Sequence, residues 1–176
     1  MNRFRNEDPS ADRGLRDVLR WAATRKPAAW PRMVEHEARY QPRDAKAGEL
    51  LITFVNHSTF LVQASDRAIL TDPVWSKRAS PVQWAGPARA HTPGIPFEHL
   101  PRIDVVLVSH NHYDHMDLPT LRRLQARFEP QVVTTLGNKR YLEQRGLRGV
   151  IEVGWWDTHD SVTATPAQHF SARTPF

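Results

Sequence analysis

The chain contains no cysteine among its 176 residues. Disulfide bonds and zinc–thiolate sites are therefore excluded, and any transition metal must be held by histidine and carboxylate side chains. No apolar run approaches the ~20 residues that a membrane span requires. Residues 1–14 are polar and charged and lack the apolar segment of a secretory signal. We therefore expect a cytoplasmic protein with one main domain.

Long blocks of like charge are also absent, although the net charge is +5. Much of the excess lies in residues 1–48, which carry 11 Lys and Arg against 7 Asp and Glu. A basic segment is attracted to phospholipid headgroups and to nucleic acid, but it is more often simply a solvated surface. No basic patch interleaved with aromatic residues is present, so no nucleic-acid partner is expected. Peripheral membrane contact through the basic N-terminus stays open.

The sequence of residues 1–48 predicts a helix followed by an extended segment that leads into the next domain. Residues 11–25 form the expected helix, because apolar side chains recur there at helical spacing and Pro27 ends the pattern. The residues after it contain several prolines with charges between them, which favours extended backbone. We take residues 1–48 as one unit and residues 49–176 as the main domain.

Residues 49–176 predict a layered α/β domain. Three strand-like runs come first, and a strand–helix alternation follows. The expected strands are residues 50–55, 60–64, 67–71, 103–108, 131–136, 149–153 and 161–165. One helix is expected to begin after Asp117, with Pro119 in its first turn, and another to span residues 138–145. The long loop at residues 73–101 is of the kind that forms an active-site wall.

The residues that carry chemistry follow the apolar run at 103–108. They are His110, His112, Asp114 and His115. Alternate residues of an extended segment point to the same side, so His110 and His112 can converge on one ion. Asp114 and His115 precede the helix and can reach a second ion. Neutral imidazoles and a carboxylate suit zinc, and manganese or iron also fit. The alternative is a solvated polar loop.

A full ligand set needs a second segment of the chain. His169 follows the expected strand 161–165, although a lone histidine in such a place is often a surface or core residue. Asp72 precedes Pro73, where a turn former alone would account for it. Trp155 and Trp156 either line a pocket or pack. The remaining histidines are expected to be surface or packing residues: His36, His57, His91, His99 and His159.

Several segments together resemble the metallo-β-lactamase fold superfamily. Residues 109–117 are similar to its signature. Residues 56–61, 70–76, 154–156 and 166–176 are similar to the branch that contains N-acyl-phosphatidylethanolamine-hydrolysing phospholipase D. The resemblance implies an α/β fold of the αβ/βα sandwich type. It further implies that this chain corresponds to the N-terminal half plus a short extension, with the second half missing.

The resemblance also implies roles for single residues. His110, His112 and His169 match the ligands of a first zinc ion, and Asp114 and His115 match ligands of a second. Asp72 is then expected to support the metal loop without binding an ion. The metal-bridging aspartate and the final histidine of the family lie in its second half, for which no segment here stands in.

The implied activity is metal-dependent hydrolysis through a zinc-activated hydroxide. The resemblance favours a phosphodiester in a phospholipid-like substrate, with Asp114 holding the second metal and orienting the nucleophile. Two alternatives stay open: a lactonase or other esterase on the same scaffold, and an inactive truncated metal-binding fragment. No dinucleotide-binding or phosphate-binding glycine loop is present, so no nucleotide cofactor is expected.

Overall fold

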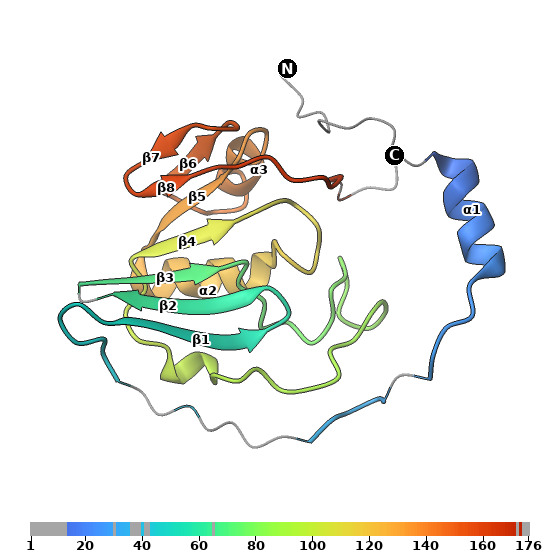
Figure 1. The fold of residues 1–176 in the computed structure, drawn as a ribbon, viewed down its shortest axis with the longest axis horizontal. Coiled ribbons are helices and arrows are strands. Elements are labelled where there is room, and N and C mark those ends of the chain that lie inside the picture. The colour runs from blue at the N-terminus through green and yellow to red at the C-terminus, as the bar shows by residue number, and fades with distance from the viewer. Residues whose placement is uncertain are drawn as a thin grey trace.

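The computed structural model of the chain describes residues 14–29, 31–35, 40, 43–64, 66–171 and 173. Their centre is a six-stranded sheet in the order β1-β2-β3-β4-β5-β6 (Figure 1). The strands are β1 Leu50–Asn56, β2 Thr59–Ala64, β3 Arg67–Thr71, β4 Val105–Val108, β5 Gln131–Thr135 and β6 Val150–Val153. The first three pair in antiparallel fashion, and β3 to β6 are parallel. The predicted layered α/β class is confirmed.

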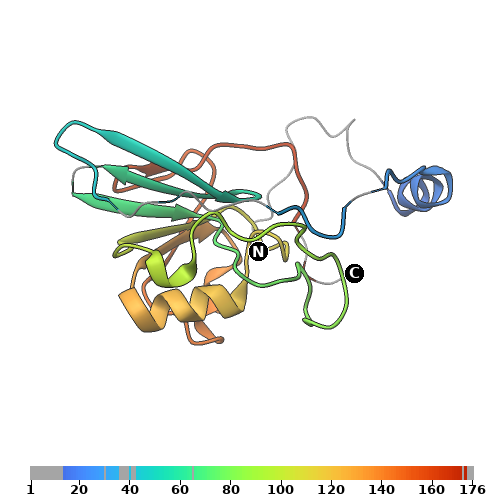
Figure 2. The ribbon, with the colours of Figure 1, turned by 90° about the horizontal axis from the view of Figure 1, so that it is seen from below.

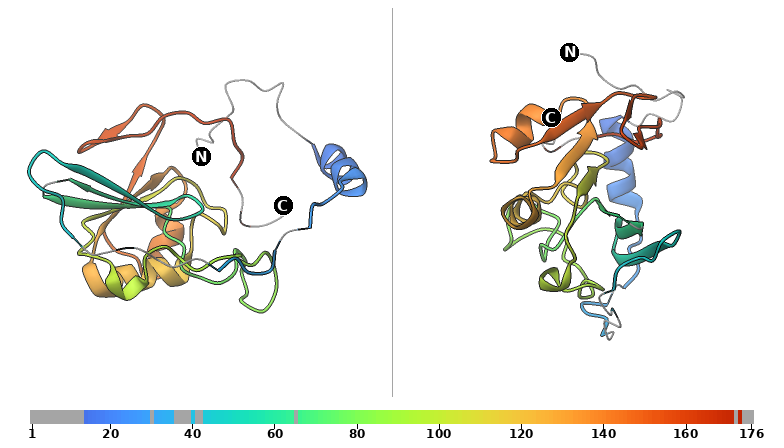
Figure 3. Two further views of the ribbon diagram at one scale, coloured as in Figure 1. Left: turned by 60° about the horizontal axis from the view of Figure 1, so that its bottom comes forward. Right: turned by 90° about the vertical axis from the view of Figure 1, so that its left-hand side faces the viewer.

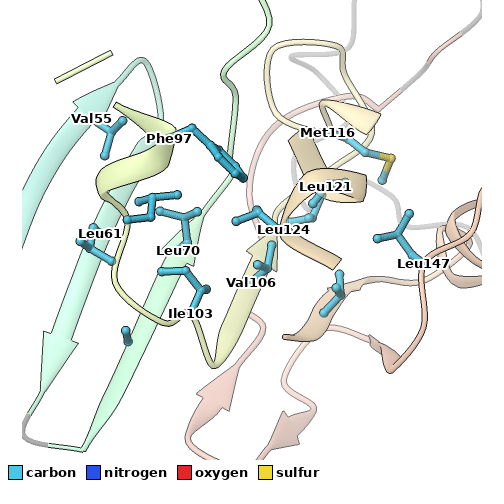
Figure 4. Close-up of a cluster of buried hydrophobic side chains, with 14 of the residues drawn as sticks. Val55, Leu61, Leu70, Phe97, Ile103, Val106, Met116, Leu121, Leu124 and Leu147 are labelled. Carbon is cyan, nitrogen blue, oxygen red and sulfur yellow. The ribbon is translucent and has the colours of Figure 1, made fainter. Parts of the chain in front are cut away.

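One face of the sheet is covered by helices (Figure 2). The helices are α2 Leu118–Phe128, α3 Lys139–Glu143 and the short 3-10 helix η2 Phe97–His99. Apolar side chains of the sheet and of α2 meet here in the main core, where Leu70, Val106 and Leu124 are fully buried (Figure 4). This burial stabilises the strands whose ends carry the polar residues described below.

The other face of the sheet is covered only in part. A hairpin of β7 Thr158–His159 and β8 Val162–Thr163 packs Val162 and Ala164 over Val105, Val133 and Val153. The strand expected at 161–165 is therefore shorter, and it pairs only with β7 instead of joining the main sheet. Because β4 is covered on both faces, its four residues are all apolar. Towards β1 the same face is exposed, as at Ile52 and Phe54.

Helix α1, Leu15–Thr24, stands apart from the sheet (Figures 1 and 2, and the left-hand view of Figure 3). The expected helix began four residues earlier, and residues 11–13 lie outside the described residues. The Asp17 carboxylate accepts the Gly14 amide at 2.9 Å in the first turn, and none of the helical residues is buried. Within the described residues, every helix is too short or too polar to cross a bilayer.

Candidate metal centre

Strand direction brings several polar segments to one edge of the sheet. The loop at residues 109–116 follows β4, and Asp72 follows β3, which runs parallel to β4. Strand β1 is two antiparallel steps from β3, so it runs in the same direction and its terminal turn at residues 57–58 lies at the same edge. The carboxyl edge of a parallel sheet is the usual place for a ligand site.

The first cluster consists of His110, His112 and His169, whose ligand atoms all lie within 4.8 Å of one another. His112 is central to it, because its Nδ1 lies 2.9 Å from His110 Nε2 and 3.3 Å from His169 Nε2. The sequence predicted this trio, and the structure brings all three side chains together. Three convergent imidazoles can hold one metal ion.

The second cluster consists of His57, Asp114 and His115 and is equally compact. Asp114 Oδ2 lies 3.0 Å from His57 Nε2 and 3.6 Å from His115 Nε2. It adjoins the first cluster, because the rings of His110 and His115 have centroids only 4.1 Å apart. The structure therefore places two groups of three donors side by side.

The sequence missed His57, which was expected to be a surface or packing residue. It lies in the two-residue turn between β1 and β2, with a left-handed φ of 44°. Counting strand directions from β1 to β4 would have placed this turn at the metal edge. Among the described residues, His91, His99 and His159 belong to neither cluster. His36 lies outside the described residues.

Asp72 links the two clusters through hydrogen bonds. Its Oδ1 accepts the Ser109 amide at 2.7 Å, and its Oδ2 accepts the Ser109 hydroxyl at 2.8 Å and lies 2.8 Å from His115 Nδ1. A carboxylate can only accept, so His115 donates from Nδ1 and presents Nε2 to the cluster. Asp72 itself touches neither His112 nor His169 in any hydrogen bond of the described chain.

Ser109 fixes the tautomer of His110 in the same way. The serine hydroxyl gives its only proton to Asp72, so at 2.9 Å from His110 Nδ1 it can only accept. His110 therefore carries its proton on Nδ1 and presents Nε2 to the first cluster. Second contacts of this kind fix the tautomer and ring orientation of metal-binding histidines.

The electrostatics of the first cluster favour the neutral form of His110 and His112. Burial, helped by three neighbouring imidazoles, lowers the pKa of His110 to about 4. Burial and the neighbouring His169 also lower the pKa of His112. Metal binding requires the neutral form of histidine, so near neutral pH protons do not compete with a metal ion for these two residues.

His115 and Asp114 behave differently because they face opposite charge. Burial lowers the pKa of His115, but the hydrogen bond and charge of Asp72, together with Asp114, outweigh it and raise the pKa overall. Burial raises the pKa of Asp114, but its backbone hydrogen bond and the charges of His115 and His57 lower it overall. The ionised carboxylate of Asp114 is a metal ligand in its binding form.

Asp117 begins α2, as predicted, but its carboxylate does not cap the helix. It accepts the amides of Trp75 and Ser76 at 3.2 and 2.9 Å, and the hydroxyls of Ser76 and Thr120. Arg89 donates to the carbonyls of Trp75 and Ser76 from the other side. These bonds tie the start of the long loop to the end of the metal loop.

Farther along the chain, the expected pair Trp155 and Trp156 lies in the turn after β6, and Trp156 is exposed.

The donor set fits a transition metal. It comprises five imidazoles and one carboxylate, without any thiolate, which suits zinc and also manganese or iron. The histidines whose tautomer is fixed, His110 and His115, both present Nε2 towards the clusters. The residues present could therefore hold up to two ions.

Comparisons with known proteins find related chains. The family model described as "Beta-lactamase superfamily domain" matches residues 67–176. An uncharacterized protein of Mycobacterium tuberculosis is 35% identical over 133 residues, which cover 72% of this chain and 36% of that protein. The N-acyl-phosphatidylethanolamine-hydrolyzing phospholipase D 1 of Caenorhabditis elegans is 33% identical over 139 residues, covering 70% of this chain and 39% of the relative. The chain thus spans little more than a third of either relative.

A solved structure shows the same fold. It is Igni18, described as a novel metallo hydrolase from the archaeon Ignicoccus hospitalis. The TM-score is 0.53 at 19% sequence identity, and the match covers 70% of this chain and 51% of that chain. At this identity the likeness concerns the fold alone.

The contact between Asp72 and His115 predicts a titration effect in the metal-free protein. Replacing Asp72 by Asn should lower the pKa of His115, because the carboxylate charge favours the protonated ring. Asparagine tolerates the left-handed φ of 36° at this position, so the backbone can be retained. The pKa is read from the ring-proton shifts of His115 in an NMR titration.

Asp104→Asn is the matched control. Its carboxylate accepts the Ala68 amide at the opposite end of the strands, so the same loss of charge should leave the pKa of His115 in place. Equal shifts in both variants would show that His115 responds to overall charge and not to its contact with Asp72.

Proposed function

The chain belongs to the beta-lactamase superfamily domain family, and we propose that it is a hydrolase that works with two metal ions, most simply zinc. The observation that carries the proposal is the pair of adjoining donor clusters at the carboxyl edge of the sheet. His110, His112 and His169 would hold one ion. His57, Asp114 and His115 would hold the other.

Bound ions of this kind lower the pKa of water to roughly 7 and neutralise negative charge that develops on a substrate oxygen. The protein supplies the arrangement. Asp72 and Ser109 hold the rings of His115 and His110 in one tautomer before any ion binds. The Asp114 side chain is 43% exposed, so it can hold an ion and also orient an attacking water. We assign Asp114 this catalytic role.

For the substrate we propose a phosphodiester, and specifically one in a phospholipid. The C. elegans relative supports this choice, since its name describes hydrolysis of N-acyl-phosphatidylethanolamine. The charge of the chain agrees with it, because a net charge of +5 favours an anionic substrate. The expected cytoplasmic location stays a prediction.

The assignment of His169 to the first ion can be tested against another histidine. His169→Ala should reduce zinc content to about one ion per chain, because two imidazoles alone bind the first ion weakly. His159→Ala should keep the wild-type content, since His159 lies in β7 and outside both clusters. The measurement is metal analysis after dialysis against a fixed free zinc concentration. Comparable losses in the two variants would remove His169 from the ligand set.

The proposed reaction is tested by offering two substrates to zinc-loaded protein. We expect water to cleave the bond between the phosphate and the headgroup, so that N-acyl-phosphatidylethanolamine in mixed micelles gives phosphatidate and free N-acylethanolamine, and we expect no opening of a simple lactone. His112→Ala should abolish the release, because His112 is central to the first cluster. Turnover of the lactone alone would favour an esterase. A chain that carries both ions and turns over neither substrate would contradict the proposal.

Helix α1 supplies a surface that suits a lipid bilayer. At 100° per residue, its apolar side chains Leu15, Val18 and Leu19 fall on one face, and all three are exposed. Arg20 falls on the opposite face, and Arg16 lies at its border. An exposed amphipathic helix with arginines on its polar face lies in the plane of an anionic membrane, with its apolar face among the lipid chains. We propose that α1 binds the bilayer from which the substrate is drawn.

A charge placed on the apolar face should prevent this binding. Leu19→Glu is expected to abolish sedimentation of the protein with phosphatidylserine-containing vesicles, and wild-type binding should weaken as salt rises. Thr24→Glu adds the same charge on the polar side of α1 and should retain most of the binding. Equal loss in both variants would mean that net charge alone attracts the chain. Binding that is insensitive to salt would contradict the electrostatic part.

A further inference from the structure

We propose that Arg173 is the positioning residue that holds His169 against the metal loop. The inference rests on the proposed role of His169 as a ligand of the first ion. It adds a residue that binds no ion and no substrate, but on which the third imidazole depends.

His169 needs such a tether because its own segment is irregular. Residues 164–171 form neither helix nor strand, and the side chains around His169 are exposed. The last backbone pairing before it is at Ala164, whose amide donates to Asp157 in the β7–β8 hairpin. Beyond that point, within the part of the chain that the structure describes, the His169 amide donates only locally, to the Ala167 carbonyl. An exposed segment of this kind has many conformations, and ordering it costs free energy.

On the C-terminal side of His169, the guanidinium of Arg173 anchors the segment to the metal loop. Its Nη1 donates to the carbonyls of Asn111, at 3.1 Å, and Met116, at 2.7 Å. These carbonyls lie near the two ends of the metal loop, so one nitrogen both closes the loop and fastens the segment to it. Met116 is fully buried, and its carbonyl would lose this partner if Arg173 moved away. Bonds from a charged donor are stronger than neutral ones.

Two aromatic rings hold the guanidinium in place. Its carbon lies 4.1 Å from the ring centroid of Tyr113 and 5.4 Å from that of Tyr141. The Tyr113 hydroxyl in turn donates to the Arg173 carbonyl at 3.1 Å. A planar guanidinium can stack and donate at the same time, whereas a lysine ammonium cannot reproduce both contacts.

Ser171 adds a second, weaker link between the same segments. Its hydroxyl donates to Asn111 Oδ1 at 2.8 Å and accepts the Asn111 amide at 3.3 Å. The segment from Ala164 to Arg173 is thus fixed at both ends, and His169 lies between them. This explains how an imidazole on an irregular segment comes within 3.3 Å of His112.

The proposal is tested by coupling Arg173 to His169 in a double-mutant cycle. Arg173→Met should weaken zinc binding at the first site roughly 10- to 100-fold, as loss of a supporting contact does. Arg173→Met in a His169→Ala background should weaken it far less, because only the contacts of Arg173 with the metal loop are then left to lose. Additive losses would overturn the proposal. Arg148→Met is the control, since Arg148 forms an exposed ion pair with Glu129.

A second readout uses the metal-free protein and does not depend on the proposed function. Phe170 is exposed on an irregular segment, so chymotrypsin should cleave after it faster when the segment detaches from the metal loop. We expect Arg173→Met to speed this cleavage about tenfold or more, given the strength of charge-assisted bonds. Arg173→Lys should give an intermediate rate, and Arg148→Met the wild-type rate. Unchanged cleavage in Arg173→Met would overturn the tether even if zinc never binds.

Ser171→Ala tests whether faster cleavage reflects detachment of the segment and not a general folding defect. It removes only the weaker link to Asn111, so it should speed cleavage after Phe170 modestly while the thermal unfolding midpoint stays at the wild-type value. Cleavage at the wild-type rate in this variant and in Arg173→Lys would contradict the proposal.

Discussion

The arrangement of the site depends on the carboxylate of Asp72. It is 7% exposed and meets three donors, the Ser109 amide, the Ser109 hydroxyl and His115 Nδ1. Hydrogen bonds to a charged group contribute about 1.5–3 kcal/mol each, and leaving such a group buried without partners costs more. One side chain at the end of β3 thereby fixes the start of the metal loop and the rings of one histidine in each cluster.

The core makes this contact possible by fixing β3 beside β4. Leu70 and Val106 are paired neighbours in the sheet and both are fully buried, so the two strands cannot slip without exposing them. The Asp72 amide continues the pairing by donating to the Leu107 carbonyl at 2.8 Å. Packing on the helical face therefore sets the position of polar groups at the edge.

Five imidazoles close to one another would repel if all were protonated. Burial and mutual proximity lower the pKa of His110 and His112, while Asp72 and Asp114 raise the pKa of His115. His110 and His112 thus favour the neutral form that metal binding requires, whereas His115 must give up a proton more readily held. His169 belongs to the same cluster but comes from an irregular segment, so contacts outside the cluster must hold it there.

The sequence by itself determined the element types and the central motif. Apolar periodicity located the six main strands and three helices to within a few residues, and the spacing of His110, His112, Asp114 and His115 marked the loop that carries chemistry. Only the tertiary structure decided that His57 joins Asp114 and that residues 161–165 pair with β7 alone. The reason is that a sequence pattern reports only on residues a few positions apart. His57 and Asp114 are 57 positions apart, and only strand direction and packing bring them together.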